Sequence, residues 1–392
     1  MRHMRSILLR TTALLFAMSA IACAPDTDAG SQSTTYFPGP GEAWEHRAPA
    51  EVGLDSSRLA EAVEYAASNE TQDVRVDFSD HAERFGEPDG PLPQSRGGSA
   101  GLIVRDGYIV AEWGDTERPD LCFSATKSFV STMVGLAVDD GLIDDVDDPV
   151  GQYIHDGRFD SPHNAKVTWR HLLQQTSEWE GVLFDRADTA DFFHRRGRTE
   201  ARQEPGTYYE YNDVRVNLAS YGALLMLRRP LPDVFRERIM EPIGASDTWT
   251  WHGYRNSDVD VDGRTVTSVS GGGHWGGGLW ISARDMARFG YLFLQRGEWD
   301  GKQLISESWI DAATTPSELR SNYGFMWWLT PDEADVGVPS PVFAARGHGG
   351  NVIWIDTRND LVVVTRWFGG GWQELQDLIL ASVLEPAAAE AN

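Results

Sequence analysis

Positive charge is scarce in this sequence of 392 residues. Its 59 aspartates and glutamates outnumber its 34 lysines and arginines, so the formal net charge is −25. No basic patch stands out, which argues against nucleic acid as a partner and against electrostatic attachment to anionic lipid. An acidic excess of this kind is typical of a solubilising surface.

Cysteine is almost absent, because the chain has only Cys23 and Cys122. If Cys23 is lipidated or removed, Cys122 is alone and no intrachain disulfide can form. Cys122 lies two residues before Ser124, yet a buried, small apolar side chain is a better interpretation than a catalytic thiol. The ten histidines are scattered without metal-ligand spacing, so neither a metal nor another cofactor is expected.

The longest apolar run near the amino terminus, residues 11–22, is too short to span a bilayer as a stable helix. It follows Arg2, Arg5 and Arg10, which is typical of an export signal, predicted here over residues 1–23. We therefore expect an exported protein of the periplasm or cell envelope.

The end of this segment resembles a bacterial lipoprotein cleavage box, in which Cys23 becomes the lipidated amino terminus. Ala20 stands where leucine is usual, and simple secretion after cleavage is the alternative. The lipid on Cys23 would be the only membrane attachment. Residues 24–44 are predicted to form a flexible tether, followed by a single domain over 45–392.

Lysine is rarer still: the chain has three, and one of them, Lys127, lies three residues after Ser124. Both fall at the start of a predicted helix that ends at Gly141, and residues three apart share a helix face. Serine needs a neighbour to take its proton before it can act as a nucleophile, and a partly buried lysine can do so. Ser-x-x-Lys alone is a weak signal, because a surface lysine on an ordinary helix explains it equally well.

A second informative stretch follows the Pro205-Gly206 turn and contains Tyr211 at a predicted entry from loop to helix. A side chain at such an entry can point into a cleft. A lysine nearby would favour the phenolate and lower the tyrosine pKa. Taken alone, Tyr211 is better interpreted as an aromatic core or turn residue.

The remaining elements predicted by apolar periodicity lie at the two ends of the chain. They are a helix over 55–69 capped by Asp55, a hairpin over 101–113, strands over 325–329, 342–345, 352–355 and 361–367, a helix over 286–295 and a final helix over 372–384.

Two other patterns suggest catalysis but fit poorly. Ser99 lies in a G-x-S-x-G pattern, but a polar loop precedes it and a strand follows, whereas a nucleophile elbow needs a strand before and a helix after. His171 is a possible base by residue type, although a structural histidine in a helix capped by Thr168 is the better interpretation. The glycine-rich loop over 270–280 has no Gly-Lys-Ser/Thr and so does not predict phosphate binding.

Taken together, three motifs make the chain resemble the penicillin-recognising serine hydrolases of the class C β-lactamase and D-Ala-D-Ala carboxypeptidase type. The branch it resembles most holds carboxylesterases and 6-aminohexanoate-dimer hydrolases, and the resemblance covers roughly residues 45–385. The motifs, in order, are Ser124-Ala125-Thr126-Lys127, Tyr211-Asn212-Asp213 and His348-Gly349-Gly350.

This resemblance implies an α/β (α+β) fold of the β-lactamase type. Both chain ends would build one antiparallel sheet flanked by helices, and residues of about 125–270 would form a mostly helical second lobe. The site would lie in the cleft between the lobes.

The resemblance also implies roles for individual residues. Ser124 would attack the carbonyl and form an acyl-enzyme, while Lys127 and Tyr211 share the general-base and general-acid work. The backbone N–H groups of Ser124 and Asn351 would form the oxyanion hole. His348, Gly349, Gly350 and Asp213 would contribute to substrate binding.

Two departures from the family pattern bear on the substrate. Asp213 stands where asparagine is usual, and His348 begins a motif that usually reads Lys-Thr-Gly. Loss of that lysine and gain of a carboxylate should weaken the binding of a substrate that carries a free carboxylate. We therefore expect hydrolysis of small neutral esters or amides. The alternatives are a β-lactamase or D-Ala-D-Ala carboxypeptidase, and a non-catalytic envelope sensor; the oligomeric state stays open.

Overall fold

The computed structural model describes residues 35–41, 43–72, 89, 95–191, 202–272, 278–332 and 337–384. The chain divides into two units, residues 1–35 and residues 36–392, and the second is described below. The predicted export signal over 1–23, with Cys23, lies outside the described residues. Within the described ranges, no helix is long and apolar enough to cross a membrane.

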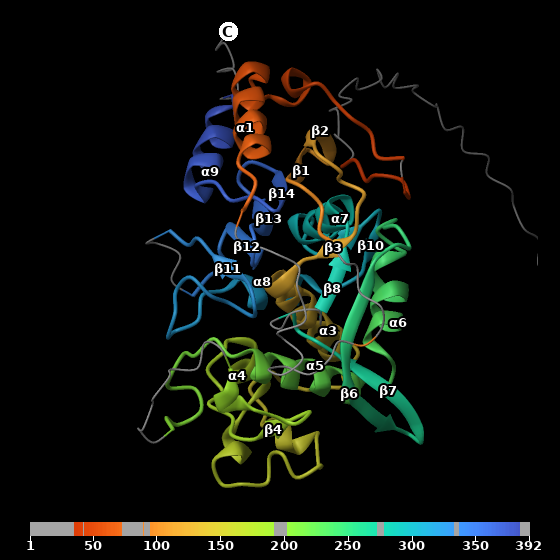
Figure 1. Cartoon of the computed structure of the whole chain (residues 1–392). Coiled ribbons are helices and arrows are strands. Elements are labelled where there is room, and N and C mark those ends of the chain that lie inside the picture. The colour runs from red at the N-terminus through yellow and green to blue at the C-terminus, as the bar shows by residue number, and fades with distance from the viewer. Residues whose placement is uncertain are drawn as a thin grey trace, which may run out of the picture. The chain divides into compact units, whose positions relative to one another are not determined.

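Six antiparallel strands form the central sheet, in the order β11-β12-β13-β14-β1-β2 (Figure 1). Their bounds are β1 (Ala100–Arg105), β2 (Tyr108–Trp113), β11 (Trp328–Leu329), β12 (Val342–Gly347), β13 (Asn351–Asp356) and β14 (Leu361–Arg366). The hairpin β1–β2 joins the strands of the carboxyl-terminal part through β1, where Ala100 lies opposite Arg366 of β14. Both ends of the chain therefore build one sheet, as predicted.

Helices cover both faces of this sheet, and the strand sequences show why. In β14 the side chains alternate: Val362 and Val364 join the main core, whereas Leu361 and Val363 join a second, smaller core. A strand that is buried on both faces reads as a continuous apolar run. Helix α7 (Ala283–Leu294) packs on β1, β13 and β14. Helices α1 (Ser56–Ser68) and α9 (Trp372–Ala381) lie side by side (Figure 1), and their apolar residues belong to the smaller core.

Eight α-helices are found among the described residues, and most begin at a residue that caps the amino end. Asp55 caps α1 by accepting from the backbone N–H groups of Ser57 and Arg58, as predicted. The bounds are α1 (Ser56–Ser68), α3 (Thr126–Asp139), α4 (Trp169–Leu173), α5 (Asp213–Leu227), α6 (Leu231–Phe235), α7 (Ala283–Leu294), α8 (Glu307–Thr314) and α9 (Trp372–Ala381).

The middle of the chain forms the mostly helical lobe that was predicted, with one addition. A long hairpin of β6 (Thr250–Val261) and β7 (Arg264–Val269) flanks the helices. Its charged outer side chains, such as Asp258 and Asp260, hid it from an apolar-pattern search. The remaining strands are short: β3 (Asp120–Leu121), β4 (Val182–Leu183), β5 (Arg186–Ala187), β8 (Gly278–Ile281), β9 (Glu298–Trp299) and β10 (Lys302–Gln303).

The packed unit begins earlier than the sequence suggested. Tyr36 stacks on Tyr108 with ring centroids 4.1 Å apart. Trp44 is 3% exposed and donates its indole N–H to the Gly107 carbonyl oxygen at 2.7 Å. The predicted tether over 24–44 is therefore wrong for residues 36–41, 43 and 44. The aromatic side chains among them, Tyr36, Phe37 and Trp44, bury apolar surface against the sheet and α7.

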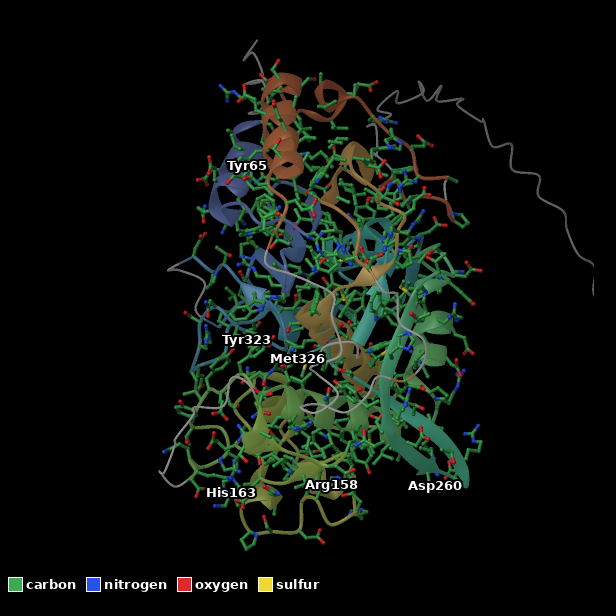
Figure 2. The ribbon with its side chains drawn as sticks, viewed as in Figure 1. Tyr65, Arg158, His163, Asp260, Tyr323 and Met326 are labelled. Atoms are coloured by element: carbon green, nitrogen blue, oxygen red, sulfur yellow. The ribbon has the colours of Figure 1, made fainter. Side chains whose placement is uncertain are left out.

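One predicted strand is much shorter in the structure. Residues 325–329 were expected to be extended, but only Trp328 and Leu329 form β11. Met326, labelled in Figure 2, has φ +62° and donates its N–H to the Leu173 carbonyl oxygen at 3.0 Å. This left-handed residue turns the chain toward the helical lobe, so the strand begins only after it.

Candidate active site

Ser124 lies in a short 3₁₀ turn, Phe123–Ala125, that leads directly into α3. The residue before it, Phe123, has φ +50°, a conformation that costs free energy for a bulky side chain and is often found at functional sites. The Phe123 ring is held edge-on by Trp367 at 6.0 Å and His348 at 5.5 Å. These ring contacts hold the turn in place, and Ser124 lines a cavity.

Lys127 projects from the first turn of α3 back to this serine. Its ammonium nitrogen, Nζ, donates to Ser124 Oγ at 3.0 Å. The same nitrogen lies 2.6 Å from Oδ1 of Asp213, and both side chains of this ion pair are 2% exposed. The lysine is therefore shared between the serine and the carboxylate of Asp213, which the resemblance had implied to be a substrate-binding residue.

The ion pair decides the protonation of Lys127. Burial of the ammonium by itself lowers the pKa of Lys127, but the attraction of Asp213, with a smaller contribution from Tyr211, more than offsets burial and raises that pKa above its ordinary value. Lys127 is thus an ammonium at neutral pH. Desolvation does oppose the charge of Lys127, as expected, but the carboxylate beside it outweighs desolvation and favours the charged form.

Tyr211 meets both of these residues. Lys127 Nζ lies 4.8 Å from the centroid of its ring. Burial raises the pKa of Tyr211 above its ordinary value; Lys127 and hydrogen bonds with Ser124 and Lys127 oppose this rise, while Asp213 adds to it. The predicted effect of a neighbouring lysine is present, because Lys127 lowers the pKa of Tyr211, but burial outweighs it. The phenol lies within hydrogen-bonding reach of the serine, as a proton carrier must.

Backbone hydrogen bonds hold the segment that carries Tyr211 and Asp213. Asn212 caps α5 by accepting from the N–H of Arg215, and its own N–H donates to the side chain of Gln175 at 3.0 Å. The N–H of Asp213 donates to Asp191 Oδ2 at 2.7 Å. These contacts fix the first turn of α5, so that the residues on either side of the cap reach Ser124 and Lys127.

A fully buried arginine stabilises this arrangement from behind. Arg215, 1% exposed, lies within 3.4 Å of Glu178, 3.2 Å of Asp188 and 3.0 Å of Glu210. Buried carboxylates need such a partner, because leaving them unpaired in the interior is costly. The network links the loop before α5 to the rest of the lobe.

The third motif approaches the serine from the end of β12. A Cβ atom on Gly347 would lie 1.9 Å from the carbonyl oxygen of Cys122, so only glycine allows β12 to run this close to the Ser124 turn. His348, Gly349 and Gly350 then form the turn into β13, with positive φ at Gly349 and Gly350. Asn351 is fully buried, and its side-chain amide donates to the His348 carbonyl oxygen at 2.6 Å.

These elements enclose a cavity of about 440 Å³. It is lined by Ser124, Tyr209, Tyr211, Arg320, Trp328, Arg346, Gly347 and His348. Of the predicted residues, Ser124, Tyr211 and His348 reach the cavity wall, whereas Lys127 and Asp213 lie buried next to it. Asn351, predicted to contribute an oxyanion donor, is not among the lining residues.

The sequence analysis missed five of the described residues of the cavity wall. Tyr209, Arg346 and Gly347 stand within two residues of recognised motifs, so their position was a usable signal. Arg320 and Trp328 come from the segment between α8 and β12, where no pattern in the sequence points to a site. Only the folded chain brings them to Ser124.

The rejected nucleophiles lie elsewhere. The hydroxyl of Ser99 donates to the Ala66 carbonyl oxygen at 3.0 Å in the loop before β1. Cys122 is fully buried, and burial raises the pKa of its thiol. His171 accepts at Nδ1 from the N–H of Thr168, which in turn caps α4. Each has the structural role that was predicted for it.

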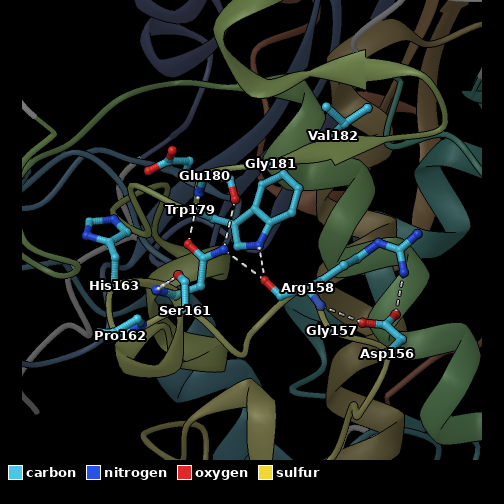
Figure 3. A pocket seen from close by; sticks show the side chains of 11 residues that line it. Asp156, Gly157, Arg158, Ser161, Pro162, His163, Trp179, Glu180, Gly181 and Val182 are labelled. Atoms are coloured by element: carbon cyan, nitrogen blue, oxygen red, sulfur yellow. Dashed lines mark hydrogen bonds and ion pairs between the residues drawn. The ribbon is translucent and has the colours of Figure 1, made fainter.

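A second cavity, of about 790 Å³, opens on the helical lobe (Figure 3). Its polar groups bond to one another: Asn164 donates to the carbonyl oxygens of Arg158 and Glu180, and the Trp179 indole N–H donates to the Arg158 carbonyl oxygen at 3.1 Å. None of the predicted catalytic residues lines it. Among the described residues, no group of acidic, histidine or cysteine side chains is arranged to hold a metal ion.

Comparison with known proteins agrees with this geometry. The profile of the family named Beta-lactamase matches residues 87–372. The 6-aminohexanoate-dimer hydrolase of Paenarthrobacter ureafaciens is 26% identical over 318 residues, which are 72% of this chain and 76% of that protein.

Two solved structures share the fold. A family VIII carboxylesterase is similar with a TM-score of 0.52 and 18% identity, covering 84% of this chain and 98% of its own. A β-lactamase/D-alanine carboxypeptidase from Pseudomonas syringae has a TM-score of 0.56 and 15% identity, covering 85% and 99%.

Proposed function

The chain belongs to the Beta-lactamase family and is a serine hydrolase of that family, and from this premise we propose that it cleaves small carboxylic esters or amides through an acyl-enzyme on Ser124. The observation that carries the proposal is the contact of one hydroxyl with two proton-bearing groups. Lys127 Nζ lies 3.0 Å from Ser124 Oγ, and the Tyr211 phenol is hydrogen-bonded to the same serine.

Of these two groups, Tyr211 is the better proton acceptor. Lys127 is held as an ammonium by Asp213 and has no free lone pair. Its positive charge instead favours the phenolate of Tyr211. In our proposal Ser124 Oγ bonds to the carbonyl carbon as its proton passes to the phenolate form of Tyr211, and the resulting phenol then protonates the leaving alcohol or amine as the bond to the carbonyl carbon breaks. Water repeats the sequence in reverse to release the acid.

The oxyanion of the tetrahedral intermediate needs backbone donors. The Ser124 N–H, at the start of the turn into α3, is one. For the second, we favour the N–H of His348 over that of Asn351. His348 lines the cavity and Asn351 does not, and Gly347 brings the backbone of this strand end against the Ser124 turn.

Two other functions compete with this one. The mutually bonded Ser124, Lys127 and Tyr211 disfavour a non-catalytic sensor, because binding alone does not require a serine with two proton-bearing partners. A β-lactamase or D-Ala-D-Ala carboxypeptidase would act on substrates with a free carboxylate. That possibility gains support from two arginines in the cavity wall, Arg320 and Arg346.

The proposal is tested by initial rates on p-nitrophenyl butyrate and nitrocefin for the wild type, Ser124→Ala and Ser99→Ala. We expect ester turnover that is abolished in Ser124→Ala and retained in Ser99→Ala, with slow nitrocefin turnover. Intact mass after rapid quenching should show one butyryl group on the wild type and none on Ser124→Ala. Undiminished ester turnover in Ser124→Ala would refute the proposal, and dominant nitrocefin turnover would favour the β-lactamase.

A further inference from the structure

The wall of the Ser124 cavity is positively charged, in a chain whose net charge is −25. Among the described residues that line it, Arg320 and Arg346 are present and no carboxylate is found. The nearby charges of Lys127 and Asp213 cancel one another in their ion pair. Two arginines are therefore left to determine which charge a bound molecule should carry.

Arg346 has no acidic partner among the described residues. It precedes Gly347 at the end of β12, and its Nε is buried without a hydrogen-bond partner. Burial alone lowers the pKa of its guanidinium, with no carboxylate opposing it. Its contact is instead with an aromatic ring, that of Trp372, 5.6 Å from the guanidinium carbon. A buried donor of this kind gains free energy when an acceptor arrives.

Arg320 is positioned by aromatic rings. Its guanidinium carbon lies 4.4 Å from the ring centroid of Tyr209 and 5.3 Å from that of Trp328. Its Nε donates to Asn322 at 2.9 Å, and no ion pair with a described residue involves it. A guanidinium held in this way loses little rotamer freedom when its terminal nitrogens bind a ligand.

The aromatic wall is itself braced. Tyr323, labelled in Figure 2, packs edge-on against Tyr209 at 5.5 Å and against Trp328 at 5.0 Å. The hydroxyl of Tyr209 is buried and has no hydrogen-bond partner among the described residues. The described part of the cavity wall thus offers two arginine cations, this hydroxyl and flat apolar surfaces.

We propose that Arg320 and Arg346 form a carboxylate subsite beside Ser124, so that the esters or amides cleaved in the proposed reaction carry a free carboxylate. That such substrates are cleaved rests on the proposed function, whereas the binding of a carboxylate by the two arginines does not. It reverses the expectation from the missing Lys-Thr-Gly lysine, because arginines from other positions supply the positive charge. Planar guanidinium groups match a carboxylate through paired N–H donors.

Two matched substrates test the subsite: p-nitrophenyl hydrogen glutarate, which carries a free carboxylate, and p-nitrophenyl methyl glutarate, its neutral analogue. The readout is the ratio of kcat/KM for the acid to kcat/KM for the methyl ester. We expect a wild-type ratio above one that falls about 10-fold or more in Arg320→Gln and in Arg346→Gln. Arg264→Gln, which removes the same charge from β7, should keep the wild-type ratio.

Binding to Ser124→Ala separates this inference from the proposed reaction. Titration calorimetry with monomethyl glutarate and dimethyl glutarate should show tighter binding of the monoacid, and the preference should disappear when Arg320→Gln or Arg346→Gln is added. If Ser124→Ala binds the monoacid more tightly but the wild type turns over neither ester, the subsite is supported and the proposed reaction is refuted. Turnover with neither a kinetic nor a binding preference for the acid would overturn the subsite alone.

Discussion

The ammonium of Lys127 and the carboxylate of Asp213 lie 2.6 Å apart, and each side chain is only 2% exposed. A charge pair so deeply buried is maintained by mutual attraction, because either charge alone would be strongly disfavoured in the interior. The pair holds Lys127 as an ammonium beside Ser124 and Tyr211. In the proposed reaction, lysine would therefore supply charge and tyrosine would move the proton.

The substitution Asp213→Asn should move the pH dependence of the reaction to lower pH. Asp213 raises the pKa values of both Lys127 and Tyr211, so its removal lowers both. A base with a lower pKa is deprotonated at a lower pH. In the wild type, kcat/KM should still be rising with pH at pH 8 to 9, since burial raises the pKa of Tyr211.

The measurement is a profile of kcat/KM for a p-nitrophenyl ester between pH 5 and 10, with the uncatalysed rate subtracted. Asp260→Asn, on the β6–β7 hairpin (Figure 2), removes one negative charge elsewhere and should keep the wild-type profile. Identical profiles for Asp213→Asn and the wild type would mean that Asp213 does not control the proton transfer.

Replacing Arg215 with methionine should destabilise the fold strongly. The change leaves Glu178, Asp188 and Glu210 without their shared buried cation, and breaking a buried ion pair from one side costs about 3–5 kcal/mol. The free energy of unfolding from urea titration is the readout. Arg229→Met removes an exposed partner of Glu237 and should have little effect; equal losses in the two variants would contradict a special role for the Arg215 network.

The substitution Gly347→Ala should separate β12 from the Ser124 turn. The new Cβ would lie 1.9 Å from the Cys122 carbonyl oxygen, and overpacking of this kind costs about 1–3 kcal/mol. Ester turnover should fall more than stability does, because the displaced atoms carry the proposed oxyanion donors. In Gly98→Ala the nearest atom is the end of the Glu70 side chain, at 3.3 Å, so that variant serves as the control. Wild-type turnover in Gly347→Ala would show that this close approach is dispensable.

The pH dependence of stability should contain a contribution from Asp360. Burial, together with a hydrogen bond to Asp106, raises the pKa of Asp360 to about 6. Between its unfolded pKa and pH 6 the folded state holds a proton that the unfolded state has lost. Stability from this group is therefore present at low pH and is lost as the pH rises through about 6.

Asp360→Asn mimics the protonated form and should raise the melting temperature at pH 8 relative to wild type, with a smaller difference at pH 4.5. Asp300→Asn is a matched control, since Asp300 is an exposed turn residue with a similar positive φ, +47° against +49°. An Asp360→Asn effect of the same size at both pH values would exclude titration of this carboxyl as the cause.

Export and lipidation remain predictions from residues 1–23. In a bacterial host, the wild type should label with radioactive palmitate and sediment with membranes, and Cys23→Ala should do neither. Cys122→Ala, which changes the other, buried cysteine, should behave as the wild type. Soluble wild-type protein lacking residues 1–23 would indicate simple secretion instead.

Local patterns were sufficient for much of the fold. The apolar run of β14, the hairpin β1–β2 and the Asp55 cap of α1 each depend on neighbours within a few residues, and all three are found where predicted. The three motifs likewise identified the family. The β6–β7 hairpin was missed because its polar outer residues obscure the period of two.

The protonation of the site was decided by tertiary structure alone. Lys127 and Asp213 are 86 positions apart in the sequence, so nothing local indicated that their ion pair would outweigh the desolvation of the lysine. The same holds for the charge of the cavity. The missing Lys-Thr-Gly lysine was visible in the sequence, whereas the approach of Arg320 and Arg346 to Ser124 depends on how β11, β12 and α3 pack. The strength of an electrostatic interaction depends on the distance between the charges and on how deeply they are buried. For residues so far apart in the sequence, both quantities are determined only when the chain folds.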